Sequence, residues 1–216
     1  MTTELPRLIY FPTRGRAELI RLTLAEAGVA YEEENFVGAD GFAALKASGR
    51  LPFGAVPLWH EPDGFNLAQS AAIACHIARG HGLHGKSARA NARCDETVGT
   101  YDDVRAEFRK IMLADPEKRP ELRAALVTTV LPRWFTMLEQ RLASNLAGGD
   151  YMVGDAVTIA DLAVWYLLET ASDNGFGATF AGKTHLEALF ARIGSRPRIA
   201  EYVKSSRRWP VQLLPG

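Results

Sequence analysis

The feature that most constrains the fold is a change of pattern near residues 80–87. On its N-terminal side, short apolar runs alternate with segments of helical spacing, whereas on its C-terminal side only helical spacing recurs. A chain of 216 residues is long enough for one large domain or two small ones. We therefore predict an α/β domain over residues 1–82, a linker over 83–87 and an all-helical domain over 88–216.

The N-terminal part is predicted to have the order strand, helix, strand, helix, strand, strand, helix. These elements are expected at residues 8–11, 16–27, 31–36, 42–47, 56–59, 65–67 and 70–79. The last two strands flank Glu61-Pro62-Asp63-Gly64, whose residue types favour a tight turn, so we expect them to form a hairpin. This order predicts a small sheet made of a βαβ unit followed by a ββα unit.

Only helices are predicted after Ser87. Helical spacing of apolar residues is found at 98–112, 122–142, 186–193 and 198–204. Pro132 is expected to kink the second of these segments. A further helix is expected to begin at Thr158, because Asp161 lies three residues on and can complete a capping box.

Composition excludes several classes of protein. The 25 Lys and Arg residues balance 25 Asp and Glu residues, so the chain lacks the basic surface typical of a nucleic-acid-binding protein. Two cysteines are too few for a disulfide scaffold. We find no signal peptide and no run of about 18 apolar residues, so we expect a cytoplasmic protein that does not span a membrane.

Residues 80–87 match the phosphate-loop pattern Gly-x-x-x-x-Gly-Lys-Ser. A phosphate loop follows a buried strand, but an Ala-rich helical segment precedes this one, so we interpret it as a domain linker. His81 and His84 have no third metal ligand nearby in the sequence, so no metal site is expected. Cys75 is expected to be a small core residue, whereas Cys94 could be exposed.

Four fragments of the chain resemble those of one family. They are Tyr10-Phe11 with Arg14-Gly15-Arg16-Ala17-Glu18, then Leu51-Pro52-Phe53-Gly54-Ala55-Val56-Pro57, then Gln69-Ser70-Ala71-Ala72-Ile73, and the capping box. Together they resemble the tyrosine-type cytosolic glutathione transferases, most closely the sigma-type group, which also includes prostaglandin isomerases and lens proteins. The resemblance implies a thioredoxin-like N-terminal domain, an all-helical C-terminal domain, and a homodimer that uses glutathione as cosubstrate, with no other cofactor and no metal.

The resemblance gives Tyr10 the catalytic role. Only the thiolate of glutathione attacks electrophiles well, and a free thiol of this kind has a pKa of about 8.5. A hydroxyl that donates a hydrogen bond to the sulfur would favour the thiolate by roughly 1.5–3 kcal/mol, which corresponds to about one or two pKa units. Arg16 could add positive charge near the sulfur, or it could be a solvated residue of the first helical turn.

Binding of the tripeptide is expected at three further places. A cis bond between Val56 and Pro57 would let the Val56 main chain pair with the cysteinyl main chain of glutathione. Gln69 and Ser70 open a helix whose free N–H groups suit the γ-glutamyl carboxylate. Lys46 matches a basic residue that faces the glycyl carboxylate, although a lone lysine on a helix could equally be solvated.

Two residues are expected at a dimer interface. Asp103 matches an acidic residue that reaches the α-amino group of glutathione bound to the partner subunit, or it lies on an exposed helix face. Phe53 matches an aromatic residue that some classes insert between helices of the partner, the alternative being packing within its own domain.

The chain departs from the family pattern at the glycyl end of the glutathione site. Phe42 stands where related proteins carry a tryptophan that bonds glutathione, and phenylalanine has no donor. Ala55 replaces a common Lys or Gln, and the loop at residues 48–50 is about two residues longer. The electrophile pocket is expected between the domains, near Phe11, Thr13, Arg105 and Tyr166.

We therefore expect a detoxifying glutathione transferase that joins the glutathione thiolate to small hydrophobic electrophiles. One alternative is a glutathione-dependent isomerase of the prostaglandin type. Another is a non-catalytic member of the same fold that serves as a structural or carrier protein. The enzyme is favoured because Tyr10 and the pair Gln69-Ser70 are all present.

Overall fold

The computed structural model describes residues 4–145 and 150–215. Its one sheet has the order β2-β1-β3-β4. The four strands are β1 (Arg7–Tyr10), β2 (Glu32–Asn35), β3 (Leu58–His60) and β4 (Asn66–Ala68). β1 runs parallel to β2 and antiparallel to β3, which pairs antiparallel with β4. The predicted βαβ and ββα units are therefore confirmed.

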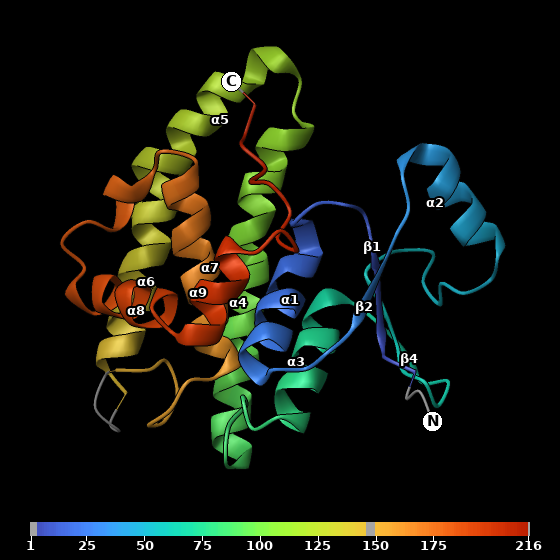
Figure 1. The fold of residues 1–216 in the computed structure, drawn as a ribbon. Helices are drawn as coiled ribbons and strands as arrows, with labels where there is room; N and C mark the ends of the chain where they lie inside the picture. Colours follow the sequence, from blue (N-terminus) through green and yellow to red (C-terminus); the bar gives the residue numbers. More distant parts are fainter. Residues whose placement is uncertain (1–3, 146–149, 216) are drawn as a thin grey trace.

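The helices of this half lie on both sides of the sheet. They are α1 (Glu18–Ala27), preceded by a 3-10 turn at Gly15–Ala17, α2 (Gly38–Ala47) and α3 (Ser70–Gly80). In Figure 1, α1 and α3 lie between the sheet and the rest of the molecule, and α2 lies on the far side. The hairpin strands begin one or two residues later than predicted, because Pro57 has no N–H to donate to the sheet.

Helices make up the regular structure of the described residues after Ser87, as predicted. They are α4 (Ala88–Leu113), α5 (Arg119–Ala125), α6 (Leu131–Ala143), α7 (Ile159–Asp173), α8 (Thr184–Gly194) and α9 (Pro197–Lys204), with 3-10 turns at Pro116–Lys118 and Gly177–Phe180. A π-helical stretch, Leu126–Val130, joins α5 to α6. The disturbance expected at Pro132 therefore lies in the turn before it, where a proline ring crowds the preceding helix.

One apolar core joins the two halves of the molecule. It is built around α7, which is buried along most of its length and contacts α1, α3 and α4. Cys75 belongs to this core, as expected. The suggestion that Cys94 is exposed is wrong: α4 turns it inward, where it is fully buried and burial raises the pKa of its thiol to about 11. No helix of the described residues has the length and apolar character needed to cross a lipid bilayer.

A network of buried charges holds α1 against β2 and the C-terminal residues. Arg21 is fully buried and donates to Glu33 at 2.6 Å, and it also pairs with Glu18 at 3.5 Å. Arg208 donates to Glu18 at 2.7 Å and pairs with Glu169 of α7. These charged hydrogen bonds fix the end of β1, where the candidate site begins, relative to the helical half.

Candidate active site

A cavity of about 850 Å³ opens where the C-terminal end of β1 meets the helical half. Both halves of the chain contribute to its wall. Of the residues singled out in the sequence, those that line it are Tyr10, Phe11, Thr13, Arg16, Phe42, Phe53, Ala55, Val56, Pro57, Gln69, Ser70, Arg105 and Tyr166. Its size is that of a small-molecule site, and it combines apolar walls with a few polar groups.

Tyr10 is the last residue of β1, and its hydroxyl faces the turn that leads into α1. Its oxygen accepts a hydrogen bond of 2.9 Å from the Arg16 main-chain N–H, while its ring packs edge-on against Phe11 at 5.6 Å. An oxygen that accepts from a main-chain N–H keeps its own proton available for donation. The hydroxyl therefore remains a donor on the wall of the cavity.

Gly15 makes this position of the hydroxyl possible. Its φ angle is +43°, and a Cβ atom there would lie 2.6 Å from the Tyr10 hydroxyl oxygen. No other residue type avoids that overlap, so the glycine of the Arg14-Gly15-Arg16 fragment is needed for close approach to the phenol.

Arginines line the same cavity as the Tyr10 hydroxyl. Arg16 is exposed at the rim of the cavity, and the more deeply placed Arg105 lies with its guanidinium over the ring of Tyr101 at 5.6 Å. Arg14 is held by bonds to the Trp209 carbonyl at 2.8 Å and to Asp173 at 3.0 Å. Arg16 and Arg105 therefore add positive charge to the cavity, which suits an anionic ligand, whereas the charge of Arg14 is paired with that of Asp173, another lining residue.

Two unusual pieces of main chain lie beside Tyr10, where β3 begins and β4 ends. The Val56–Pro57 bond is cis, as predicted. Gln69 has a φ of +73°, and it is the only residue other than glycine with a positive φ in the described part of the chain. Such strained residues cluster at functional sites. Gln69 immediately precedes α3, so the free N–H groups of that helix and the buried Ser70 lie at the cavity wall.

Phe42 lies in the wall as part of an aromatic cluster. It stacks on Phe36 with ring centroids 5.7 Å apart and lies 5.5 Å from Phe11. Lys46 is exposed and does not line the cavity, but its ammonium lies over the Phe42 ring, 4.6 Å from the centroid. A cation over an aromatic face is a stabilising arrangement, and it holds the lysine beside the wall.

Phe53 and Asp103 lie at the molecular surface. Phe53 lines the cavity and is 71% exposed, so it is not packed within its own domain. Asp103 lies on α4, is exposed, and does not line the cavity.

Sequence reasoning gave no role in the site to several lining residues. They are Pro12, Arg14, Gly15, Val37, Gly38, Ala68, Phe108, Arg109, Met112, Leu113, Thr170, Asp173, Asn174, Val211, Gln212 and Leu214. Phe108, Arg109 and Met112 continue the face of α4 that carries Arg105, so helical spacing could have found them. The segment with Val211 and Leu214 has no regular structure, and no local pattern indicates that it covers the cavity.

Family models and known proteins match nearly the whole chain. The glutathione S-transferase N-terminal domain matches residues 6–79, and the C-terminal domain matches residues 102–206. Glutathione S-transferase A of Cavia porcellus is 32% identical over 207 residues, covering 95% of this chain and 93% of that protein.

Solved structures agree with this match. A glutathione S-transferase of C. elegans has a TM-score of 0.82 and 29% identity, over 96% of this chain and 98% of its own. A prostaglandin synthase D of Nilaparvata lugens shares the fold, with a TM-score of 0.80 and 23% identity over 96% of this chain and 100% of its own.

Proposed function

The chain belongs to the glutathione S-transferase family, and we propose that its cavity binds glutathione and presents the thiolate to small hydrophobic electrophiles. The observation that carries this proposal is that Tyr10, Val56 and Ser70 line one cavity. A hydrogen-bond donor for sulfur, a cis main-chain segment and a helix N-terminus therefore face the same space.

The mechanism follows from the proton of the Tyr10 hydroxyl. Because the oxygen accepts from the Arg16 N–H, its own proton can point to the sulfur, and donation to a charged acceptor is the stronger kind of hydrogen bond. Arg16 and Arg105 add positive charge to the same cavity. The thiol loses its proton to solvent, and the thiolate forms a carbon–sulfur bond with the electrophilic carbon. For an aromatic halide the carbon–halogen bond breaks and halide leaves, while the phenol remains protonated throughout.

The main-chain segments beside Tyr10 supply the contacts for the tripeptide. We assign the Val56 main chain to the cysteinyl unit, and Gln69 with Ser70 to the γ-glutamyl carboxylate. Lys46 lies next to the wall at Phe42 and is assigned to the glycyl carboxylate, in place of the donor that Phe42 lacks. The apolar side, with Phe11, Thr13, Arg105 and Tyr166, is left for the electrophile. Pro57 only sets the direction of the main chain.

A conjugation assay tests the proposal directly. Purified protein, glutathione and an aromatic halide should give the thioether faster than the same mixture without protein. A carrier protein of the same fold would bind glutathione without raising the rate. That result would contradict the proposed function.

Ser70→Ala is expected to raise the KM for glutathione about 10–100-fold. The hydroxyl is a buried donor at the N-terminus of α3, and a hydrogen bond to a charged group contributes about 1.5–3 kcal/mol. Steady-state kinetics with varied glutathione measures the effect. Ser87→Ala is a matched control, because Ser87 caps α4 by accepting from the Ala90 N–H at 3.2 Å and lies outside the cavity. Equal KM values for the two variants would contradict the assignment of Ser70.

We also propose a homodimer in which Phe53 packs against the partner and Asp103 faces the partner's glutathione. Phe53 supports this because a phenylalanine that is 71% exposed is costly unless covered. The Phe53→Ser variant is expected to shift the dimer toward monomer at least tenfold in dissociation constant, measured by sedimentation equilibrium. Phe65→Ser removes another exposed phenylalanine, 42% exposed and beside His76, and should leave the dimer unchanged. A wild-type monomer would contradict the proposal.

Three finer assignments belong to this proposal. Tyr10 supports the tyrosine-type branch of the family, whereas the sigma-type group stays a prediction from the sequence fragments. The expected domain limits, with a linker at 83–87, agree with the start of α4 at Ala88 and are proposed as the functional division. We place the reaction in the cytoplasm.

A further inference from the structure

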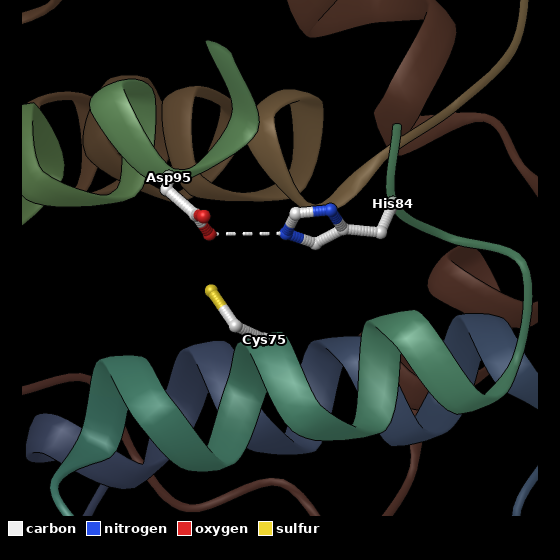
Figure 2. Close-up of side chains that lie close together, drawn as sticks. All are labelled: Cys75, His84 and Asp95. Carbon is white, nitrogen blue, oxygen red and sulfur yellow. Dashed lines mark hydrogen bonds and ion pairs between the residues drawn. The ribbon is translucent and has the colours of Figure 1, made fainter. Parts of the chain in front are cut away.

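Three potential metal ligands meet where the two halves of the chain join, away from the residues that line the cavity. Cys75 comes from α3, His84 from the loop that follows, and Asp95 from α4 (Figure 2). Their Sγ, ring nitrogen and carboxylate oxygen atoms all lie within 4.8 Å of one another. Sequence reasoning dismissed His84 as a ligand because the two partners lie nine and eleven positions away, on separate helices.

Both ring nitrogens of His84 face acceptor oxygens. Nδ1 lies 2.9 Å from Asn91 Oδ1, and Nε2 lies 3.1 Å from Asp95 Oδ1. A neutral imidazole has one N–H, and the tautomer that donates to Asn91 leaves the Nε2 lone pair free to bind a cation beside Asp95. A ligating histidine commonly donates its other N–H to an oxygen in this way.

Cys75 supplies the third donor. Its side chain is buried, and in Figure 2 the sulfur points toward the gap between Asp95 and His84. Burial raises the pKa of this thiol to about 12, so a bound cation has to displace a proton from the sulfur. The proposed reaction uses neither Cys75 nor His84.

The loop that carries His84 is already fixed in place. A Cβ on Gly85 would lie 2.3 Å from the Asn91 main-chain nitrogen, so the loop is pressed onto the first turn of α4. The Leu83 carbonyl accepts from the Ile159 N–H at 2.8 Å, which ties the loop to α7. Because this loop is already fixed, the three ligand residues lose little conformational entropy when a cation binds.

We propose that Cys75, His84 and Asp95 form a binding site for one zinc-like divalent cation, with water as the fourth ligand. Sulfur, imidazole and carboxylate are the ligands that zinc takes in tetrahedral sites, whereas magnesium and calcium prefer oxygen alone. Zinc bonds of about 2.0–2.3 Å place ligand atoms roughly 3.3–3.6 Å apart. The Nε2–Oδ1 separation is already 3.1 Å, and the half-exposed Asp95 gives access for the water.

Arg79 supports Asp95 from outside the cluster. Its guanidinium donates to both carboxylate oxygens, at 2.7 and 2.8 Å. The Cys75 thiolate and the Asp95 carboxylate carry two negative charges, and Arg79 carries one positive charge. The net charge of one negative unit favours binding of a cation. Bound metal would link α3 of the first half to α4 of the second, so its effect would be on stability rather than on the reaction.

Cobalt(II) titration of the full, untagged chain in the absence of glutathione tests the site. We expect one ion per chain, an ultraviolet thiolate-to-cobalt absorption band, and loss of that band when Zn²⁺ is added. Cys75→Ala should abolish the band, and Asp95→Asn and His84→Asn should each weaken binding at least tenfold. The matched controls Cys94→Ala and His81→Asn should bind as wild type does.

Several results would overturn the proposal. One such result is that cobalt at saturating concentration gives no thiolate-to-cobalt absorption band. This is the result expected if His84 is an imidazolium that donates to both oxygens, because its charge would repel the cation. A band that persists in Cys75→Ala, or equal affinity in Asp95→Asn, would place the ion elsewhere. Asp95→Asn is nearly isosteric at an exposed position, so its test does not depend on refolding of the core. The conjugation rate of metal-free Cys75→Ala should equal that of wild type. If the metal site proves absent, the proposed transferase function is therefore unaffected.

Discussion

Replacement of Tyr10 by phenylalanine is expected to lower kcat/KM for conjugation about 10–100-fold. The variant removes one donor to a charged sulfur, a contribution of roughly 1.5–3 kcal/mol, and each 1.36 kcal/mol is a factor of ten. The pKa of the bound glutathione thiol should rise by about one or two units. The ring keeps its edge-on contact with Phe11, so the fold is expected to be unchanged.

Ultraviolet absorbance of the bound thiolate, followed against pH, measures the effect on the sulfur separately from later steps. Tyr31→Phe is the matched control, because Tyr31 is also a buried tyrosine of the N-terminal half but donates to Glu33 at 3.2 Å and does not line the cavity. It should leave the thiol pKa unchanged. If the two variants and wild type titrate together, another group ionises the sulfur and the role given to Tyr10 is wrong.

Local patterns in the sequence predicted the elements that position Tyr10. Each of these elements depends on residues that are close together in the sequence. They are the short strand before Pro12, the alternating strands and helices of the N-terminal half, and the helix after Gln69. The cis bond at Val56–Pro57 was inferred from the resemblance to the family, and the structure has it. The limits of the hairpin were off by one or two residues, since they depend on which N–H groups the neighbouring strand uses.

Contacts between distant segments could not be predicted in this way. Nothing near Val211 or Leu214 indicates that they line the cavity, because the contact that places Leu214 is its N–H bond of 2.7 Å to Asn174. The sequence around Cys94 contains many polar residues, so no local pattern shows whether this position of α4 faces the core or the solvent. The cluster of Cys75, His84 and Asp95 exists only because α3 and α4 pack together.

The start of α7 is where a single change should cost the most stability. Asp161 is fully buried and accepts from the Met152 N–H at 2.7 Å and from the Thr158 N–H and hydroxyl at 2.7 and 2.9 Å. Asp161→Ala leaves three buried donors unpaired just before the central helix, at Met152 and Thr158. We expect it to lower the free energy of unfolding by about 2–4 kcal/mol, and the melting temperature by roughly 5–15 °C.

The pH dependence of this effect has a definite sign. Burial raises the pKa of Asp161 to about 6, against an ordinary value of 3.8, so the folded protein binds the proton more tightly than the unfolded chain does. Its contribution to stability therefore falls as the pH rises from about 4 through the folded pKa of about 6, and stays constant from about pH 7. The difference in unfolding free energy between wild type and Asp161→Ala should narrow over this range, by up to about 3 kcal/mol, and the variant should still be the less stable protein at pH 7.

Asp155→Ala is the control for the loop that precedes α7. Asp155 lies six residues earlier, is exposed, and pairs with the exposed Lys86 at 3.1 Å, so its loss should leave the melting temperature unchanged. Equal melting temperatures for the two variants would mean that the carboxylate of Asp161 contributes no more than a surface charge. The three donors would then be bonded to water inside the core. The capping box would not be the interaction that fixes α7 in position.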